Sequence, residues 1–177
     1  MPQLSSLHSL VNLTDRSRLG FRGPDSTAYL EARGFEVPGT PNRARSQSDG
    51  GWVVQLSNTE YFLLGSSFDE GRRLAEEEEA WSLTDMANYL LPRHDSHAWL
   101  QLKGPSIAEV MSKLCGVDMR EKAFANGDVL QTQVARLSAV VVNTGTPEER
   151  CFELLYDRCS EKYMTEVVAD AMGEFNP

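Results

Sequence analysis

The pattern of apolar and polar positions is most regular in the middle of the chain. Residues 98–103 alternate Ala98, Leu100 and Leu102 with a second set, Trp99, Gln101 and Lys103, which is the period of a half-buried strand. The next segment, residues 104–116, places apolar side chains three and four positions apart, as a helix with one buried face does. These side chains are Ile107, Val110, Met111 and Leu114. The pattern predicts a strand that leads directly into a helix.

The same order of elements is predicted in both halves of the chain. A basic residue followed by Gly and Pro stands between a strand and a helix at residues 22–24 and again at residues 103–105. Each of these helices precedes an antiparallel pair of strands and a further helix, near residues 52–81 and residues 129–173. The sequence therefore predicts an α+β fold of two repeated β-α-β-β-α units with mostly antiparallel sheet.

Domain boundaries follow from this repeat. Residues 1–17 are polar with little pattern and are expected to form an N-terminal arm. We expect the first unit to span residues 18–90 and the second to span residues 91–177, with the two packed as one compact body. Residues 38–51 are rich in Pro, Gly and Ser and are expected to form an exposed loop.

Charge and composition limit the classes of partner. The 177 residues are 41% hydrophobic and 24% charged, as in an ordinary globular domain, and the net charge is −9. All of the acidic excess follows residue 50, and it would repel nucleic acid. The longest apolar runs are far shorter than the roughly 20 residues of a membrane-spanning helix, so no membrane partner is expected. Cys115, Cys151 and Cys159 contain no C-x-x-C pair, which favours reduced thiols in a cytoplasmic protein.

The segment Arg93-His94-Asp95-Ser96-His97 is the densest group of candidate catalytic residues. On an extended strand His94 and His97 would point to opposite faces, whereas in a turn they could converge. A zinc site needs three or four ligands, and no ligand spacing links this pair to further ligands. Ser96 lacks the G-x-S-x-G turn that exposes a nucleophile. We expect a polar entry to a strand, and the alternative is a metal-dependent hydrolase built on His94, Asp95 and His97.

Charged and aromatic clusters outside that segment each allow two interpretations. Four adjacent acids, Glu76–Glu79, lie near the end of a predicted helix and form either a solvated face or a contact for a basic partner. Trp52, Trp81 and Trp99 are either ordinary core residues or anchors of a subunit interface. No phosphate-binding loop of the G-x-x-x-x-G-K-[ST] or G-x-G-x-x-G type occurs. The sequence therefore assigns no catalytic, cofactor-binding or metal-binding residue.

Five segments together carry a resemblance to a known family. They are DRSRLGFRGPDSTAYL, LPRHDSHAWLQLKGPS, LCGVD, GDVLQTQVARLSAVVV and YDRCSEKYMTEVVADAM. These segments resemble the gamma subunit of bacterial heterotetrameric sarcosine oxidases, and the similarity covers most of residues 12–175. The small subunit of N-methylglutamate dehydrogenase has much the same pattern, and the sequence does not separate the two.

The resemblance implies a place in a complex of alpha, beta, gamma and delta subunits. Such complexes oxidatively demethylate sarcosine and transfer the one-carbon unit to tetrahydrofolate. A hydride passes from the amine to FAD, and electrons then reach FMN that the beta subunit holds covalently. The alpha subunit binds NAD and the delta subunit binds zinc. The resemblance thus predicts alpha, beta and delta partners, and no cofactor in this chain itself.

The resemblance also implies the folate-binding aminomethyltransferase fold, whose enzymes carry an active-site aspartate on a hairpin. The corresponding hairpin here, Gln133–Ala139, has no carboxylate, and Asp118 and Asp128 precede it. The leading expectation is a non-catalytic, structural gamma subunit of an oxidoreductase complex. The alternatives are the equivalent subunit of N-methylglutamate dehydrogenase and a stand-alone folate-binding protein of the aminomethyltransferase type.

Overall fold

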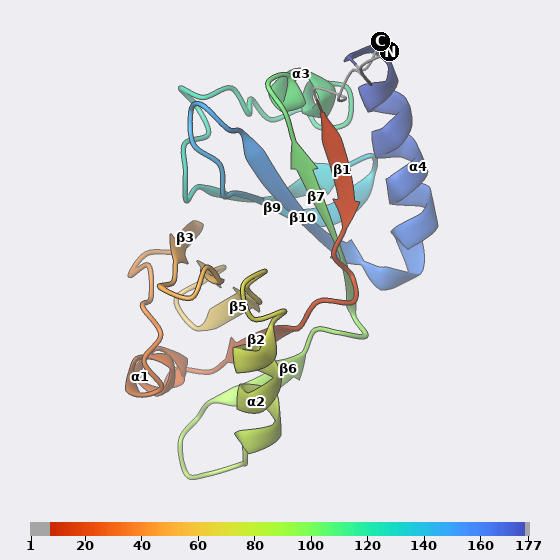
Figure 1. Cartoon of the computed structure of the whole chain (residues 1–177). Coiled ribbons are helices and arrows are strands. Elements are labelled where there is room, and N and C mark those ends of the chain that lie inside the picture. Colours follow the sequence, from red (N-terminus) through yellow and green to blue (C-terminus); the bar gives the residue numbers. More distant parts are fainter. Residues whose placement is uncertain (1–7, 176–177) are drawn as a thin grey trace. The chain divides into compact units, whose positions relative to one another are not determined.

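The computed structural model describes residues 8–175, which divide into two compact units (Figure 1). The N-terminal unit comprises Asp15–Ser96 and Gly127–Val129. The C-terminal unit comprises the described residues of Met1–Thr14, His97–Asn126 and Leu130–Pro177. The predicted α+β fold with mostly antiparallel sheet is confirmed, because each unit contains one five-stranded sheet together with helices.

Five short strands form the sheet of the N-terminal unit, in the order β3-β4-β5-β2-β6. They are β2 (Arg18–Arg22), β3 (Arg43–Ser46), β4 (Trp52–Gln55), β5 (Glu60–Leu64) and β6 (Tyr89–Pro92). Every neighbouring pair is antiparallel. The helices of this unit are α1 (Ser26–Ala32) and α2 (Arg72–Ala80).

The core of the N-terminal unit lies between the two helices and one face of its sheet. Phe21, Val53 and Leu63 point to this face from three neighbouring strands and are fully buried. Leu30 of α1 and Leu74 of α2 pack against them. Each such side chain contributes about 1.5–3 kcal/mol when it leaves water, so these contacts hold the helices on the sheet.

The exposed loop expected at residues 38–51 contains a strand in its middle. β3 has the polar sequence Arg-Ala-Arg-Ser and pairs with β4, from Arg43 opposite Gln55 to Ser46 opposite Trp52. A strand outside the middle of a sheet is held by its backbone hydrogen bonds and does not require an apolar face. The alternation that reveals buried strands is therefore missing from this one.

The sheet of the C-terminal unit has the order β1-β7-β10-β9-β8. Its strands are β1 (Ser9–Asn12), β7 (His97–Lys103), β8 (Val129–Val134), β9 (Leu137–Asn143) and β10 (Cys151–Asp157). Its α-helices are α3 (Ile107–Ser112) and α4 (Glu161–Met172), and the 3-10 segments η1 (Arg158–Ser160) and η2 (Gly173–Phe175) flank α4. The central strand, β10, pairs antiparallel with both β7 and β9.

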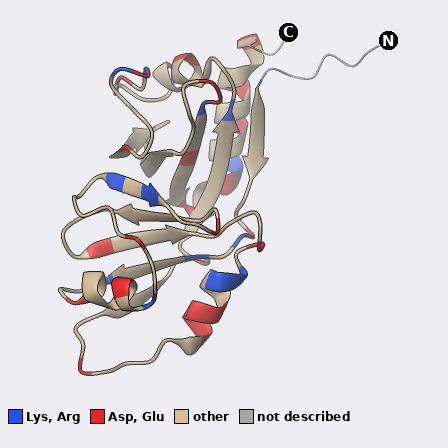
Figure 2. Cartoon of the chain, turned by 60° about the vertical axis from the view of Figure 1, so that its left-hand side comes forward, with Lys and Arg blue, Asp and Glu red and all other residues tan. Residues whose placement is uncertain are grey.

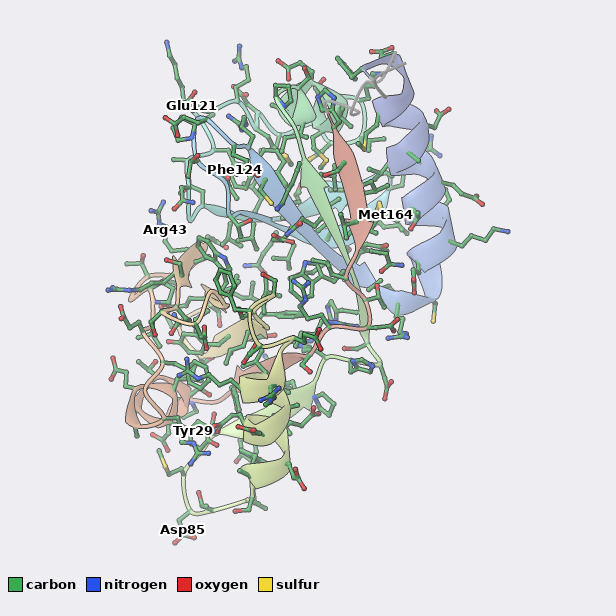
Figure 3. All side chains as sticks on the ribbon, viewed as in Figure 1. Tyr29, Arg43, Asp85, Glu121, Phe124 and Met164 are labelled. Carbon is green, nitrogen blue, oxygen red and sulfur yellow. The ribbon has the colours of Figure 1, made fainter. Side chains whose placement is uncertain are left out.

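Helices α3 and α4 pack on one face of this second sheet. Met164 of α4 points toward the sheet and belongs to the same core cluster as Phe124 (Figure 3). The stripe predicted for α3 is confirmed, because Ile107, Val110 and Met111 are fully buried in that cluster. The alternation predicted for β7 is also confirmed on this face, to which Ala98, Leu100 and Leu102 point.

The expected N-terminal arm is partly structured. Within residues 1–17, Ser9–Asn12 forms β1, an edge strand whose register runs from Ser9 opposite Lys103 to Asn12 opposite Leu100 of β7. β1 is short and exposed on much of its surface, so its sequence carries no strand period. Residues 1–7 of the expected arm lie outside the described residues.

The boundary between the units lies later than the predicted one at residue 90. β6 pairs with β2, and the N-terminal unit therefore runs through Ser96. Residues 127–129 also join this unit, because the N–H of Ala44 donates to the carbonyl of Gly127 and the N–H of Val129 donates to the carbonyl of Asn42. These bonds join backbone groups, so no hydrophobic pattern in the sequence marks them.

Each unit follows the order β-α-β-β-β-α, with one strand more than the predicted repeat. The N-terminal unit runs β2-α1-β3-β4-β5-α2 before β6, and the C-terminal unit runs β7-α3-β8-β9-β10-α4. The two Gly-Pro turns stand between β2 and α1 and between β7 and α3, as predicted. Within residues 8–175, no helix is long and apolar enough to cross a membrane.

Candidate functional site

The segment Arg93–His97 forms the turn between β6 and the start of β7. His94, Asp95 and Ser96 of this turn are exposed to solvent. The buried guanidinium of Arg18 donates a hydrogen bond to the carbonyl oxygen of His94 over 2.9 Å, so the turn is anchored through its backbone. This geometry agrees with the expectation that the segment is a polar turn leading into a strand.

Arg93 lies across the sheet of the N-terminal unit. Its guanidinium donates to Oε1 of Glu60 on β5 over 2.7 Å and lies 5.1 Å from the centre of the Phe62 ring. To reach Glu60 it crosses β2 at Gly20, where an added Cβ would come within 2.6 Å of Nε of Arg93. Glycine at position 20 therefore makes room for this ion pair, which ties the end of β6 to β5.

The histidines do not assemble into a metal site. In the described range, residues 8–175, no group of three His, Cys, Asp or Glu side chains is placed to hold one ion. The third histidine, His8, is buried, and its Nε2 accepts a hydrogen bond from the N–H of Ser106 over 3.0 Å, just before α3. The metal-dependent alternative built on His94, Asp95 and His97 thus gains no support from the geometry.

The acidic run Glu76–Glu79 divides between two environments on α2. Glu77 is buried, and its carboxylate accepts two hydrogen bonds from Nε of Arg33, at 2.9 and 3.0 Å, and one from the Tyr29 hydroxyl at 2.6 Å. Burial and the bond to Glu77 raise the pKa of Tyr29 to about 12. Glu77 thus joins α2 to α1, whereas Glu76 and Glu79 face solvent.

A buried carboxylate lies at the centre of the C-terminal sheet, on the face opposite α3 and α4. Glu153 of β10 has 3% of its surface exposed. Its Oε2 accepts a hydrogen bond from the indole N–H of Trp99 at 2.7 Å. Its Oε1 accepts from Gln101 at 2.8 Å, from the Thr144 hydroxyl at 2.9 Å and from the Cys151 thiol at 3.6 Å. Four donors of this chain therefore surround one carboxylate.

These donors determine what Glu153 can do. Three donors share the acceptor positions of Oε1 and the indole of Trp99 bonds Oε2, so side chains of this chain engage both carboxylate oxygens. Burial, followed by the charge of Glu153, raises the pKa of Cys151 to about 12, so this cysteine stays a neutral thiol. The cluster of Glu153, Trp99, Gln101, Thr144 and Cys151 is a satisfied hydrogen-bond network that fixes β7, β10 and the end of β9 to one another.

Sequence reasoning did not single out this network, although one signal was present. Glu153 is the lone charged residue within the apolar strand Cys-Phe-Glu-Leu-Leu-Tyr. An acid at such a position is buried only when it is paired. Its donors come from β7 and from the segment after β9, and this arrangement requires knowledge of the strand order. Trp99 is buried by the same network, and Trp81 packs on the core of the N-terminal unit. Both tryptophans are therefore core residues, as the first of the two interpretations predicted. Trp52, on β4, is half-buried.

The hairpin of β8 and β9 contains no Asp or Glu, whereas the resemblance to aminomethyltransferases implies an aspartate there. Its turn residues, Ala135 and Arg136, have φ angles of 48° and 70°, which a tight two-residue hairpin turn requires. The N–H of Ala135 donates to the carbonyl of Leu114 at 2.8 Å, and the Tyr163 hydroxyl donates to the carbonyl of Ala135 at 3.1 Å. Contacts from outside the hairpin hold this turn in shape.

The two aspartates that precede the hairpin are both engaged elsewhere. Asp118 pairs with Arg120 at 2.6 Å, and hydrogen bonds from Arg120 lower the pKa of Asp118 to about 2. Asp128 pairs with Arg43 in the N-terminal unit. Neither residue replaces the missing carboxylate.

A cleft of about 640 Å³ lies beside this hairpin in the C-terminal unit. Its described lining consists of His97, Gln131, Thr132, Gln133, Ser138, Ala139, Val140 and Leu155. The alternative of a folate-binding enzyme implies a carboxylate beside the pocket, and the described lining contains no Asp or Glu. The cleft therefore gives that alternative no catalytic group.

Comparison with known proteins gives the relatives of the chain. No family model matches it. It is 26% identical over 148 residues to the sarcosine oxidase subunit gamma of Corynebacterium sp. strain P-1, covering 84% of this chain and 70% of the relative. It is 25% identical over 164 residues to that of strain U-96, covering 90% and 77%. The chain is a relative of sarcosine oxidase gamma subunits.

Solved structures agree with this relationship at the level of the fold. A chain of the heterotetrameric sarcosine oxidase from Corynebacterium sp. U-96, in complex with pyrrole 2-carboxylate, superposes with a TM-score of 0.77 at 21% identity, over 96% of this chain and 86% of that one. The glycine cleavage system aminomethyltransferase T from Bartonella henselae gives a TM-score of 0.66 at 14% identity, over 93% of this chain and 46% of the enzyme. The predicted aminomethyltransferase-like fold is thus confirmed, and the chain spans about half of that enzyme.

Proposed function

We propose that this chain is the structural, non-catalytic gamma subunit of a heterotetrameric, flavin-dependent sarcosine oxidase. The observation that carries the proposal is its similarity to two sarcosine oxidase gamma subunits along 84% and 90% of its length. A non-catalytic role is supported by the hairpin without a carboxylate and by Glu153, whose two carboxylate oxygens both accept hydrogen bonds from the chain's own side chains.

In this proposal the chemistry belongs to the companion chains. The alpha, beta and delta subunits would carry FAD, covalent FMN, NAD, tetrahydrofolate and zinc in a cytoplasmic complex. Together they would oxidise sarcosine, transfer the one-carbon unit to tetrahydrofolate and reduce O2 to hydrogen peroxide. The gamma chain would contribute rigid surfaces, for which two units that each have a buried hydrophobic core are suited.

Co-expression tests the proposal. We expect the four subunits from the same source to co-elute as one complex that consumes O2 when sarcosine is added. Omission of this chain should leave a complex that is incomplete or less stable. If N-methylglutamate and not sarcosine drove the reaction, the equivalent subunit of N-methylglutamate dehydrogenase would be the correct assignment. Turnover of sarcosine by this chain alone would contradict the proposal.

A further inference from the structure

Exposed apolar side chains concentrate in one loop of the N-terminal unit. Among the described residues, seven large hydrophobic side chains are exposed, and three of them lie in the seven residues from Leu83 to Tyr89. Leu83 is 70% exposed, Met86 37% and Tyr89 51%. Single exposed apolar residues are normal on a protein surface, but a group of this kind in one short loop marks an interaction site.

The loop that carries these side chains is fixed from its inner side. The N–H of Ala87 donates to Oδ2 of Asp25 at 2.7 Å, and the N–H of Asp25 donates to the carbonyl of Ala87 at 3.2 Å. The Ser26 hydroxyl donates to Oδ1 of the buried Asn88 at 2.8 Å. Gly23 allows the close approach, since an added Cβ there would lie 1.9 Å from the carbonyl oxygen of Ala87. Met86 and Tyr89 are therefore exposed on a segment whose backbone is held in place by hydrogen bonds.

Carboxylates flank the same loop. Glu76 and Glu79 are exposed and lie three residues apart on α2, which places them on one face of that helix. Asp85 lies at the tip of the loop (Figure 3), and Figure 2 shows acidic residues along the later turns of α2 and at this tip. None of these three carboxylates has an ion-pair partner in the part of the chain that the structure describes.

The position of the acids on α2 is unfavourable for the free chain. The C-terminal end of a helix carries partial negative charge, and the last turn of α2 contains no basic residue. Cations from a partner would relieve the repulsion and complement the acids. Nucleic acid and anionic lipid surfaces are repelled by this charge, and a second copy of the chain would oppose acid with acid.

We propose that Leu83, Met86 and Tyr89, together with Glu76, Glu79 and Asp85, form the surface that docks a basic segment of a companion subunit. Lys or Arg side chains of that segment pair with the carboxylates, around an apolar contact with the loop. Tyr and Met are favoured at such contacts because they supply large contact area. The inference rests on the proposed function, because it requires that the chain work within a complex.

The test measures binding of the full chain to the companion subunits at low and high salt. We expect L83S/M86S to weaken binding by about tenfold or more, as removal of central apolar contacts does. We expect the same of E76K/E79K, with a loss that shrinks as salt rises. The Tm of free E76K/E79K should be unchanged or higher, because Lys suits the helix end. A loss of affinity without a loss of stability separates docking from misfolding.

Two matched controls make the result specific. F68S removes an apolar side chain that is 86% exposed before the opposite end of α2, and E148K/E149K makes the same change of net charge in an exposed loop of the C-terminal unit. Both should bind within twofold of the unchanged chain. If L83S/M86S and E76K/E79K bind as well as the controls, the docking surface is wrong while the proposed function stands. If the unchanged chain does not bind the companion subunits, both are wrong.

Discussion

The indole N–H of Trp99 donates to the Glu153 carboxylate over 2.7 Å, and both side chains are buried. In a chain whose fold resembles that of an aminomethyltransferase, a buried carboxylate is the first group to consider for catalysis. Here three further donors of the chain complete its hydrogen bonds. The geometry therefore indicates that Glu153 stabilises the sheet. Its contribution to the free energy of unfolding can be measured.

Replacing Glu153 by Gln should destabilise the C-terminal unit. The amide NH2 would face donors that now meet a carboxylate oxygen, and buried donors without an acceptor cost about 1–3 kcal/mol. We expect urea unfolding to show a loss of this size for E153Q. The exposed Glu149 provides the control, since E149Q should change stability by less than about 0.5 kcal/mol. Equal stability of E153Q and the unchanged chain would show that the network contributes nothing.

Thiol labelling should distinguish the three cysteines. Cys159 is exposed, whereas Cys115 and Cys151 are buried, and burial with the nearby Glu153 charge raises the pKa of Cys151 to about 12. The thiolate is the reactive form, so we expect one rapidly labelled thiol per chain at pH 8. C159S should remove the rapid phase. A second rapid thiol in C159S would contradict the buried placement of the other two.

Replacing Gly20 by Ala should weaken the N-terminal unit. The new Cβ would meet Nε of Arg93 at 2.6 Å and push the guanidinium away from Glu60. Overpacking of this kind costs about 1–3 kcal/mol. G116A is the control, because no atom lies within 4 Å of an added Cβ at Gly116. Calorimetric unfolding should show a lower Tm for G20A and little change for G116A, and the reverse order would contradict the role of Arg93.

Stability should fall at high pH partly because of Tyr29. Its pKa in the folded chain is about 12, above the ordinary value of 10. The contribution of protonated Tyr29 to the free energy of unfolding is therefore fully present below pH 10. It is lost as the pH rises through about 12. Urea unfolding between pH 9 and pH 12 should show a steeper decline for the unchanged chain than for Y29F. Parallel declines would mean that burial and the bond to Glu77 do not raise the pKa of Tyr29 in the folded chain.

The parts of the fold that could be predicted from the sequence are those with a buried face. The stripe of α3 and the alternation of β7 indicated both elements, because apolar side chains must be placed on one side to leave water. β1 and β3 were missed because edge strands with polar sequences are held by backbone bonds, which leave no hydrophobic period.

The candidate site was less predictable because its contacts are distant in sequence. The donors to Glu153 include Trp99 and Gln101, more than 50 residues earlier, and the pairing of β7 with β10 brings them together. The absence of a carboxylate on the hairpin was visible from the sequence alone, since it depends only on the residue types at 133–139. Sequence spacing reveals groups of residues that lie close together along the chain. Groups that are brought together by strand pairing can be found only when the strand order is known.

A calorimetric titration of the purified full chain with tetrahydrofolate tests the central claim most directly. If the chain retains the fold without the chemistry, no saturable heat should appear, because the cleft lacks a carboxylate and Glu153 is already occupied. The result that would contradict this account is a saturable one-to-one binding isotherm.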